Sequence, residues 1–270
     1  MSKERQAEPI ALSILVPVRN EGLNVRVMLK VLRAVVEVPH EVLVVHDEAD
    51  DDSVAVVASM GADFPHLRTL HNTLGVGVIN AIRAGVEAAA GDIILIFAAD
   101  EVGPVLAIDD MLKLMDEGCD FVSCTRYAHG GRRLGGSLIG GILSRLANRL
   151  FYALAGSALT DSTTGFKMFR RARFGDFDLQ SRPVGWAVAF EMAIKAQIMG
   201  LRLGEVPIVS IDRLFGGEST FRLGPWTMEY LRWFLWGMTR LHRAPKAGQQ
   251  GAVVVRLPRA DGEGRQMPPR

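Results

Sequence analysis

Two kinds of apolar pattern alternate along the chain from residue 10 to about residue 125. Short runs rich in Val, Ile and Leu are typical of buried strands, and stretches with apolar positions three or four residues apart are typical of amphipathic helices. Strands that alternate with helices predict a parallel sheet covered by helices on both faces. The predicted strands span residues 11–16, 41–45, 67–71, 92–97 and 121–124, and the predicted helices include residues 23–36 and 77–90.

The pattern changes after residue 130. A helix over 137–155, a strand over 165–169, a helix over 184–199 and a strand over 202–211 are predicted to extend the same α/β domain, which we place at residues 10–222. Residues 223–243 follow as an amphipathic aromatic helix. Residues 1–9 are charged, and residues 244–270 are rich in Gly, Pro, Arg and Gln, so both ends are predicted to be disordered.

The composition fits a folded domain rather than a nucleic-acid-binding or disulfide-stabilised protein. The chain has 270 residues with 49% apolar content, and its 31 basic and 30 acidic residues leave a formal net charge of +1. This near-neutral balance argues against nucleic acid as a partner. Cys119 and Cys124 have neither zinc-ligand spacing nor a disulfide framework, so we interpret them as buried thiols in a reducing compartment.

No predicted helix is a membrane span. Arginines interrupt both candidate segments, and neither reaches the roughly 18 consecutive apolar residues that such a helix needs. The charged N-terminal residues also lack the apolar core of a signal peptide. We therefore expect a cytoplasmic protein whose contact with a membrane is peripheral or mediated by a partner.

Acidic side chains follow two of the predicted strands at their carboxyl ends. Asp47 comes directly after residues 42–46, and Asp100 and Glu101 follow residues 93–99. Because the carboxyl ends of strands in a parallel sheet border one crevice, these acids are predicted to share a site for a nucleotide or a metal-bound phosphate. Ala98 occupies the position where an Asp-x-Asp metal motif would carry its first acid.

The loop after the first strand is predicted to reach the same crevice. Pro17 turns the chain out of the sheet, and Glu21 then lies near the start of the next helix. The alternative is that Asn20 and Glu21 only cap that helix and complement its dipole.

The loop after the second strand is strongly acidic. Most of its acids are expected to lie in solvent, with Asp52 or Ser53 as a helix N-cap. Asp47 is the exception, because it is the first acid after the strand and is therefore expected to lie deepest. Its carboxylate would accept hydrogen bonds from a nucleotide base.

Seven segments, in order and with matching spacing, resemble the motifs of family 2 glycosyltransferases of GT-A fold. Within that family the chain looks most like the polyprenol-phosphate (dolichyl-phosphate) mannosyl- and glucosyltransferases. The resemblance implies an α/β fold with a mostly parallel central sheet flanked by helices, and it covers residues 11–222. The matching segments are residues 16–21, 44–53, 75–92, 125–127, 143–148, 164–170, and 205–208 together with 212–213.

The resemblance implies a nucleotide-diphosphate sugar as the donor substrate. Asp100 would lie at the diphosphate and metal, beside Ala99, and Arg213 would hold a donor phosphate. The residues that would line the nucleoside pocket are Pro17, Arg19, Glu21, Val45 and Asp47.

Arg126 and Arg145 would hold the phosphate of the acceptor. Arginine suits this role because its guanidinium forms two-point, charge-assisted hydrogen bonds with phosphate oxygens. The alternative for Arg145 is that it belongs, with Arg149 one turn later, only to the polar face of a helix. With Asp100, these two arginines are the residues implied to act at the reaction centre.

The departures from the family pattern cluster at the metal site. The first metal-binding Asp is replaced by Ala98, so Mg²⁺ or Mn²⁺ would have to use Asp100 and Glu101, and its affinity is expected to fall. Metal dependence is therefore left open by this degenerate Asp-x-Asp motif. The segment after Arg213 lacks the family's Lys, for which Arg222 would substitute.

The predicted aromatic helix completes the functional expectation. Residues 226–241 combine three tryptophans with arginines, which suits a helix lying on a membrane surface or docking on a membrane protein. The alternative is a terminal helix packed on the core. We expect an inverting transferase that moves a hexose from a GDP-mannose- or UDP-glucose-type donor to a polyprenyl phosphate at the cytoplasmic membrane face.

Two other functions stay open. One is a glycosyltransferase with a soluble or different lipid acceptor, and the other is a noncatalytic relative that binds a nucleotide sugar. A homo-oligomer is also left open by the sequence.

Overall fold

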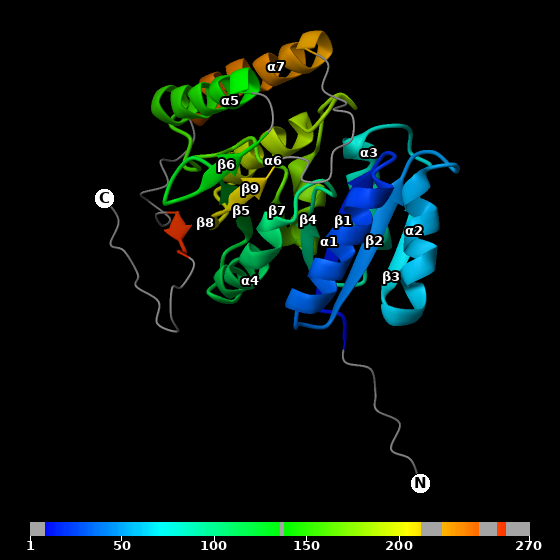
Figure 1. The fold of residues 1–270 in the computed structure, drawn as a ribbon. Coiled ribbons are helices and arrows are strands. Elements are labelled where there is room, and N and C mark those ends of the chain that lie inside the picture. The colour runs from blue at the N-terminus through cyan, green and yellow to red at the C-terminus, as the bar shows by residue number, and fades with distance from the viewer. Residues whose placement is uncertain (1–8, 136–137, 212–222, 243–252, 258–270) are drawn as a thin grey trace.

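The computed structural model describes residues 9–135, 138–211, 223–242 and 253–257 (Figure 1). The strands are β1 (Leu12–Val18), β2 (His40–His46), β3 (Leu67–His71), β4 (Ile93–Ile96), β5 (Phe121–Thr125), β6 (Arg132–Leu134), β7 (Lys167–Arg170), β8 (Leu203–Pro207), β9 (Val209–Ile211) and β10 (Val254–Val255). The α-helices are α1 (Gly22–Val35), α2 (Asp52–Met60), α3 (Val78–Ala88), α4 (Ile108–Asp116), α5 (Leu138–Leu150), α6 (Ala187–Ile198) and α7 (Leu223–Leu241). Short helical turns are η1 (Gly61–Asp63), η2 (Gly103–Ala107), η3 (Phe151–Ala155), η4 (Arg171–Arg173) and η5 (Gly175–Phe177).

The central sheet has the strand order β10-β8-β5-β7-β4-β1-β2-β3. All neighbouring pairs are parallel except those of β7, which runs antiparallel to both β4 and β5. This arrangement confirms the predicted mostly parallel sheet. β1 lies between β2 and β4, so the loops that follow these three strands meet at one edge of the sheet.

Helices cover both faces of the sheet because the side chains of each strand alternate between the two faces. In β4, Leu95 packs with α1, α2 and α4 on one face, and Ile94 and Ile96 pack with α3 and α6 on the other. The buried strands are apolar on both sides, as expected for a parallel sheet between two helical layers.

A further pair of helices, α5 and α7, lies side by side across the top of the molecule in Figure 1. The turn η3 continues α5 and packs on α7, where the rings of Phe151 and Phe234 are 5.3 Å apart. A third apolar cluster, which includes Phe190 and Trp233, joins this pair to α6. The predicted aromatic helix therefore has one face buried in the protein.

The predicted strand over residues 202–211 is two strands. β8 ends at Pro207, which lacks the N–H that would continue the ladder with β5. The amide of Ile208 then donates to the carbonyl of Thr125, at 2.9 Å. β9 pairs instead with β6 in a separate two-stranded sheet, which the sequence pattern did not predict.

Two predicted helices are shorter than expected. α5 gives way at residue 151 to η3, which has π-helical bonding and ends at Gly156 in the left-handed conformation. α6 begins three residues later than predicted because Gly185 has a φ of +55° and lies against the ring of Trp226. Segment 182–186 therefore turns before the helix starts.

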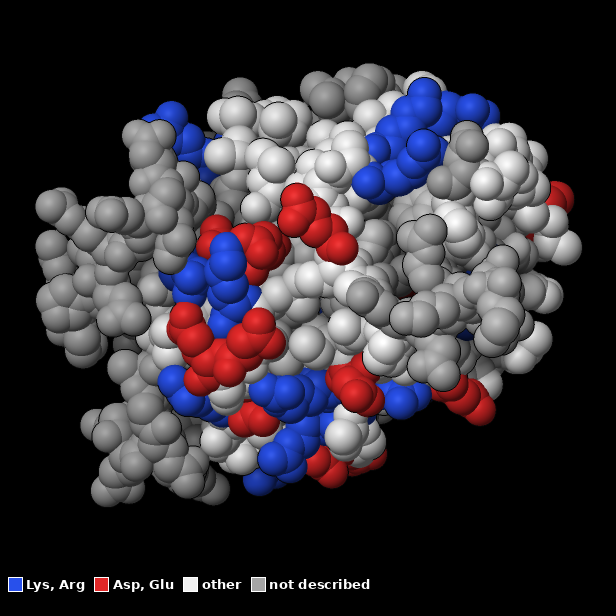
Figure 2. Space-filling view, turned by 90° about the horizontal axis from the view of Figure 1, so that it is seen from below, with Lys and Arg blue, Asp and Glu red and all other residues white. Residues whose placement is uncertain are grey.

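Part of the C-terminal segment predicted to be disordered is ordered in residues 253–257. β10 pairs with β8, and Arg256 contacts Asp110 of α4 at 3.1 Å. In the described ranges, none of the helices combines the length and apolar character that crossing a bilayer requires. On the face seen in Figure 2, basic and acidic side chains are interspersed over the left and lower part, and a separate group of basic side chains lies at the upper right.

Candidate donor and acceptor sites

The predicted acidic residues lie at the carboxyl edge of the sheet. Glu21 follows β1, Asp47 follows β2, and Asp100 follows β4, and these three strands are neighbours. The topology thus brings together the ends that the sequence predicted to share a crevice.

Asp47 is half-buried and organises the loop that precedes α3. Its Oδ1 accepts a hydrogen bond from Asn72 Nδ2 at 2.7 Å, and its Oδ2 accepts one from the Gly77 amide at 2.8 Å. Asn72 also donates to the carbonyl of Gly75. A carboxylate has about four acceptor positions, so Asp47 keeps capacity for a donor group of a ligand.

The acidic loop 47–53 also ties two helices together. Asp51 is the N-cap of α2 and accepts a hydrogen bond from the Ser53 amide, so the cap lies before both predicted positions, Asp52 and Ser53. Asp52 Oδ1 accepts from the Gly22 amide at 2.9 Å and Ser53 Oγ from the Glu21 amide at 3.2 Å. These side chains supply the start of α1 with acceptors from the neighbouring loop.

The remaining predicted nucleoside residues differ in their exposure. Pro17 is half-buried and Arg19 is exposed, with its Nη2 at 3.6 Å from Glu48 Oε1. Glu21 accepts a hydrogen bond from Asn24 Nδ2 at 2.7 Å. Val45 has no exposed surface and packs in the apolar core, so in this conformation its side chain does not line a pocket.

The residues after β4 offer an incomplete set of metal ligands. Ala98 and Ala99 are buried, and Asp100 and Glu101 are half-buried beside them. No three side chains of His, Cys, Asp or Glu cluster as metal ligands anywhere in the described ranges. A metal ion at this point would need additional ligands, such as the phosphates of a donor.

Arg126 lies after β5 and is engaged by a buried acid. Its Nε is 2.7 Å from Asp161 Oδ2, and its Nη2 donates to Asp161 Oδ1 at 3.0 Å and to Thr163 Oγ1 at 3.1 Å. Burial opposes charge on both groups, but their mutual attraction dominates: the pKa of Asp161 is lowered and the pKa of Arg126 is raised. Two of the three nitrogens of Arg126 thus already bind protein oxygens, and its contact with a phosphate stays a prediction.

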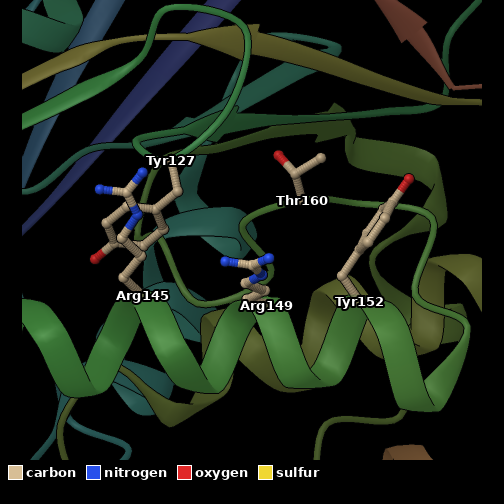
Figure 3. Close-up of a pocket in the computed structure, with 5 residues that line it drawn as sticks. All are labelled: Tyr127, Arg145, Arg149, Tyr152 and Thr160. Carbon is tan, nitrogen blue, oxygen red and sulfur yellow. The ribbon is translucent and has the colours of Figure 1, made fainter.

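A pocket of about 250 Å³ lies between α5, η3 and the loops around residues 127 and 160 (Figure 3). Side chains project from one side of the helical segment toward these loops. Tyr127 is fixed against α5 by a 2.9 Å hydrogen bond from its hydroxyl to Ser144 Oγ. The residues that line the pocket are Tyr127, Arg145, Arg149, Tyr152 and Thr160.

Arg145 and Arg149 give this pocket its positive charge. They lie one turn apart on α5 and both are exposed. Neither has an acidic partner in the part of the chain that the structure describes, so their guanidinium groups are available to an anion.

Sequence reasoning identified Arg145 but missed three other residues of this pocket. Arg149 was interpreted only as part of a polar helix face, although its spacing of four residues from Arg145 was the available signal. Tyr152 and Thr160 carried no signal, because a fold is needed to bring them to α5. Arg213 and Arg222 lie outside the described residues.

The chain was compared with known families and proteins. The model of glycosyl transferase family 2 matches residues 13–177, which is more than half of the chain. Glycosyltransferase AglD of Haloferax volcanii is 26% identical over 75% of the chain and 33% of its own length. Dolichol-phosphate mannosyltransferase of Pyrococcus furiosus is 24% identical over 82% of the chain and 61% of its own length. The chain thus spans less than two thirds of both relatives.

Solved structures agree on the fold. Glucosyl-3-phosphoglycerate synthase from Mycobacterium tuberculosis, in complex with Mn²⁺, UDP and glucosyl-3-phosphoglycerate, superposes with a TM-score of 0.63 at 18% identity. The match covers 85% of the chain and 80% of that structure. A second structure of the synthase from Mycobacterium tuberculosis, in complex with Mn²⁺, UDP and phosphoglyceric acid, has a TM-score of 0.63 at 18% identity and covers 96% of the chain and 87% of that structure.

Proposed function

Because the chain belongs to glycosyltransferase family 2, we propose that it is an inverting enzyme that transfers a hexose from a nucleotide-diphosphate sugar to a polyprenyl phosphate. The family and the GT-A fold support a glycosyltransferase. Transfer to a lipid phosphate at the cytoplasmic membrane face is the finer part of the proposal.

The donor would bind at the carboxyl edge of β1, β2 and β4. Asp47 would accept hydrogen bonds from the base, and Glu21 and Pro17 would border the nucleoside. The donor is of the GDP-mannose or UDP-glucose type. UDP in the structure of the Mycobacterium tuberculosis synthase supports a nucleotide sugar as the ligand of this fold.

The observation that carries the proposal is the pair of exposed arginines in the pocket beside α5, which have no acidic partner among the described residues. Arg145 and Arg149 would hold the phosphate of the acceptor, and the hydroxyls of Tyr127 and Thr160 lie in the same pocket. Adjacent guanidinium cations with hydroxyl groups beside them are the chemistry that recognises a phosphate monoester. Arg126 would support this site through Asp161 rather than touch the phosphate.

The surface around the pocket favours a lipid as the source of that phosphate. α5 and η3 expose Ile142, Leu143, Leu146, Leu150 and Leu154, and α7 exposes Met228, Leu231 and Leu235. Exposed apolar side chains on two adjacent helices that also carry arginines suit contact with the acyl region below lipid headgroups. A polyprenyl chain would then leave the pocket toward the membrane.

The transfer would use the acceptor phosphate as its own nucleophile. A phosphate oxygen held by Arg145 and Arg149 would attack the anomeric carbon opposite the departing diphosphate. The new carbon–oxygen bond forms as the bond to the diphosphate breaks, which inverts the configuration. The phosphate is already ionised near neutral pH, so positioning rather than a strong base would supply most of the rate.

A divalent ion fits the donor site only in part. Asp100, with Glu101 beside it, would hold Mg²⁺ or Mn²⁺ together with oxygens of the donor, and the ion would neutralise the diphosphate. The described residues do not form a complete ligand set. The binding of the acceptor phosphate by α5 does not depend on the ion.

The proposal is tested by incubating the full chain with polyprenyl phosphate in vesicles and a panel of radiolabelled nucleotide sugars. Transfer of label into the lipid phase is the expected result. Label transferred only to soluble phosphate esters would indicate the soluble-acceptor alternative. No transfer to any acceptor, with nucleotide binding intact, would indicate a noncatalytic relative.

A further inference from the structure

Glu205 belongs to a segment that resembles a family motif but has no role in the reaction proposed above. It lies in β8, is 1% exposed, and reaches the turn formed by Thr160 and Asp161. Its Oε1 accepts hydrogen bonds from the amides of Thr160 at 2.9 Å and Asp161 at 3.3 Å. Its Oε2 accepts from Thr160 Oγ1 at 2.9 Å. One buried carboxylate therefore holds the turn at three points.

This turn serves both parts of the acceptor site. Thr160 lines the pocket with Arg145 and Arg149, and Asp161 forms the ion pair with Arg126. The Thr160 hydroxyl also lies 2.8 Å from Thr125 Oγ1. Loss of the Glu205 contacts would thus release a wall of the pocket together with the anchor of Arg126.

The surroundings of Glu205 favour protonation of its carboxylate near neutral pH. Burial raises its pKa to about 7, although the hydrogen bonds from Thr160 and Asp161 favour the charged form. His129 Nε2 is 3.8 Å away, but burial lowers its pKa, so it adds little positive charge. The other titratable groups that interact with this carboxylate are Cys124 of β5, Asp161 and Lys167 of β7, and Arg126 lies on the far side of Asp161. The side chain of Arg256, which follows β10, binds Asp110 and Glu117 instead.

We propose that Glu205 is a positioning residue of the anion pocket, and that its carboxylate takes up a proton when an anion binds between Arg145, Arg149 and Thr160. The anion and the carboxylate carry charge of the same sign and are separated by one side chain. In a buried setting such a pair lowers its free energy by protonating one member. This inference rests on the proposed anion pocket but not on the transfer reaction.

The hydrogen bonds allow this protonation without rearranging the turn. A protonated carboxyl still accepts from the two amides through its carbonyl oxygen, and its own O–H donates to Thr160 Oγ1. The Thr160 hydroxyl then no longer needs to donate to Glu205, so its hydrogen is free to turn toward the pocket. Proton uptake therefore removes a negative charge and adds one donor for the anion.

The test uses octyl sulfate below its micelle concentration, because a sulfate ester keeps a constant charge while a phosphate ester titrates. Calorimetry of the full chain in two buffers of different ionisation enthalpy measures both affinity and proton uptake. For the natural chain we expect uptake of about half a proton near neutral pH, and binding about fivefold tighter near pH 6 than near pH 7.5. If octyl sulfate binds to the natural chain with almost no proton uptake, the inference is overturned.

Two variants test whether Glu205 is the group that takes up the proton and whether the Thr160 hydroxyl contributes to anion binding. In Glu205→Gln we expect no proton uptake and a flat affinity over this range. Thr160→Val keeps the hydrogen bond from the backbone amide of residue 160 to Glu205 but lacks the hydroxyl. In this variant we expect weaker binding of octyl sulfate at low pH. Uptake unchanged in Glu205→Gln would also overturn the inference, and so would Thr160→Val binding like the natural chain.

The matched control is Glu191→Gln. Glu191 is a fully buried carboxylate that accepts from the amides of Gln180 and Ser181, at 2.6 and 2.7 Å, away from the pocket. Its replacement should cost stability without altering proton uptake. If octyl sulfate fails to bind, or binds equally well to Arg145→Ala and Arg149→Ala, the anion pocket itself is refuted. Binding that needs both arginines but takes up no proton refutes only the role of Glu205.

Discussion

Arg126 and Asp161 form a two-point ion pair, with Nε to Oδ2 at 2.7 Å and Nη2 to Oδ1 at 3.0 Å. The Asp161 side chain has no exposed surface, and that of Arg126 is 12% exposed. The pair joins the end of β5 to the loop before β7. Arg126 therefore stabilises the loops that surround the proposed acceptor site.

Replacing Arg126 with Met should destabilise the fold strongly, because it leaves the charge of Asp161 buried without its ion-pair partner. We expect a loss of about 3–5 kcal/mol in the free energy of unfolding, measured by urea denaturation. The double variant Arg126→Met with Asp161→Asn should recover part of this loss. Equal stability of the single variant and the natural chain would show that the ion pair does not stabilise the fold.

The same variant should lose the part of the acid dependence of stability that comes from Asp161. Although burial raises the pKa of Asp161, Arg126 and Lys167 lower it below its ordinary value. The stabilisation from this group is thus present above the pKa of the unfolded chain and is lost as the pH falls through the lower folded-state pKa. Without Arg126, burial dominates and raises the folded-state pKa of Asp161, so protonation of this group favours the folded variant and its deficit in the free energy of unfolding should shrink as the pH falls. Urea denaturation of both chains at a series of falling pH values measures this change.

Arg145→Ala and Arg149→Ala should each weaken acceptor use while sparing the donor. Loss of a charged hydrogen-bond donor to phosphate is expected to raise the KM for polyprenyl phosphate about 10- to 100-fold. The Kd for the nucleotide should stay unchanged. Arg26→Ala, at an exposed position of α1, is the matched control. An equal loss of donor and acceptor binding would refute the assignment.

Asp47→Asn should weaken nucleotide binding about tenfold or more. The amide can accept at only one oxygen, so its NH₂ group would face the Gly77 amide, which is also a donor. Calorimetric titration with GDP and UDP measures the effect. Asp50→Asn, an exposed acid in the same loop, should leave binding unchanged. A Kd of Asp47→Asn equal to that of the natural chain would remove Asp47 from the donor site.

Ala98→Asp should increase the metal dependence of nucleotide binding. In the natural chain we expect the thermal shift caused by nucleotide to differ little between Mn²⁺ and EDTA, because the described carboxylates near β4 form no complete ligand set. In the variant, Mn²⁺ should enlarge the shift. Ala98→Asn introduces a side chain of similar size without the charge, and therefore tests whether size alone enlarges the shift. Complete loss of nucleotide binding by the natural chain in EDTA would contradict the prediction.

Leu146→Glu and Leu235→Glu should each reduce binding to vesicles. Both side chains are exposed, one on α5 and one on α7, and a charge at either position cannot enter the apolar layer. We expect a loss of about tenfold in the partition coefficient, measured by flotation. Val35→Glu, at the end of α1, should have no effect. Membrane binding that both charges leave intact would place the contact elsewhere.

The sequence predicted most of the fold but only part of the site. Strand positions and the acids at strand ends follow from local patterns, so Asp47 and Asp100 were placed at the correct edge of the sheet. The ion pair of Arg126 joins residues 35 positions apart, and nothing local signals its partner. The predicted roles of Asp47, Asp100 and Arg145 stay predictions until they are tested.

Edge pairing was the least predictable feature of the fold. β6 and β9 have three residues each and β10 has two, and such short runs do not stand out from loops in a sequence. Pro207 was the available sign that the last predicted strand divides. The direction of β7 was also hidden, because a strand's pattern is the same in both directions.

The position of β7 has a consequence for how the protein folds. β4 and β5 are separated in sequence by only the segment that carries α4, yet in the sheet they are joined through β7, whose residues come about forty positions later. During synthesis the first four strands can pair as they emerge, but β5 has no place beside them until residue 170 has been made. The donor side therefore assembles first, and the acceptor side depends on slower, long-range closure. Truncations before β7 should leave an open edge at β4, where such chains would aggregate.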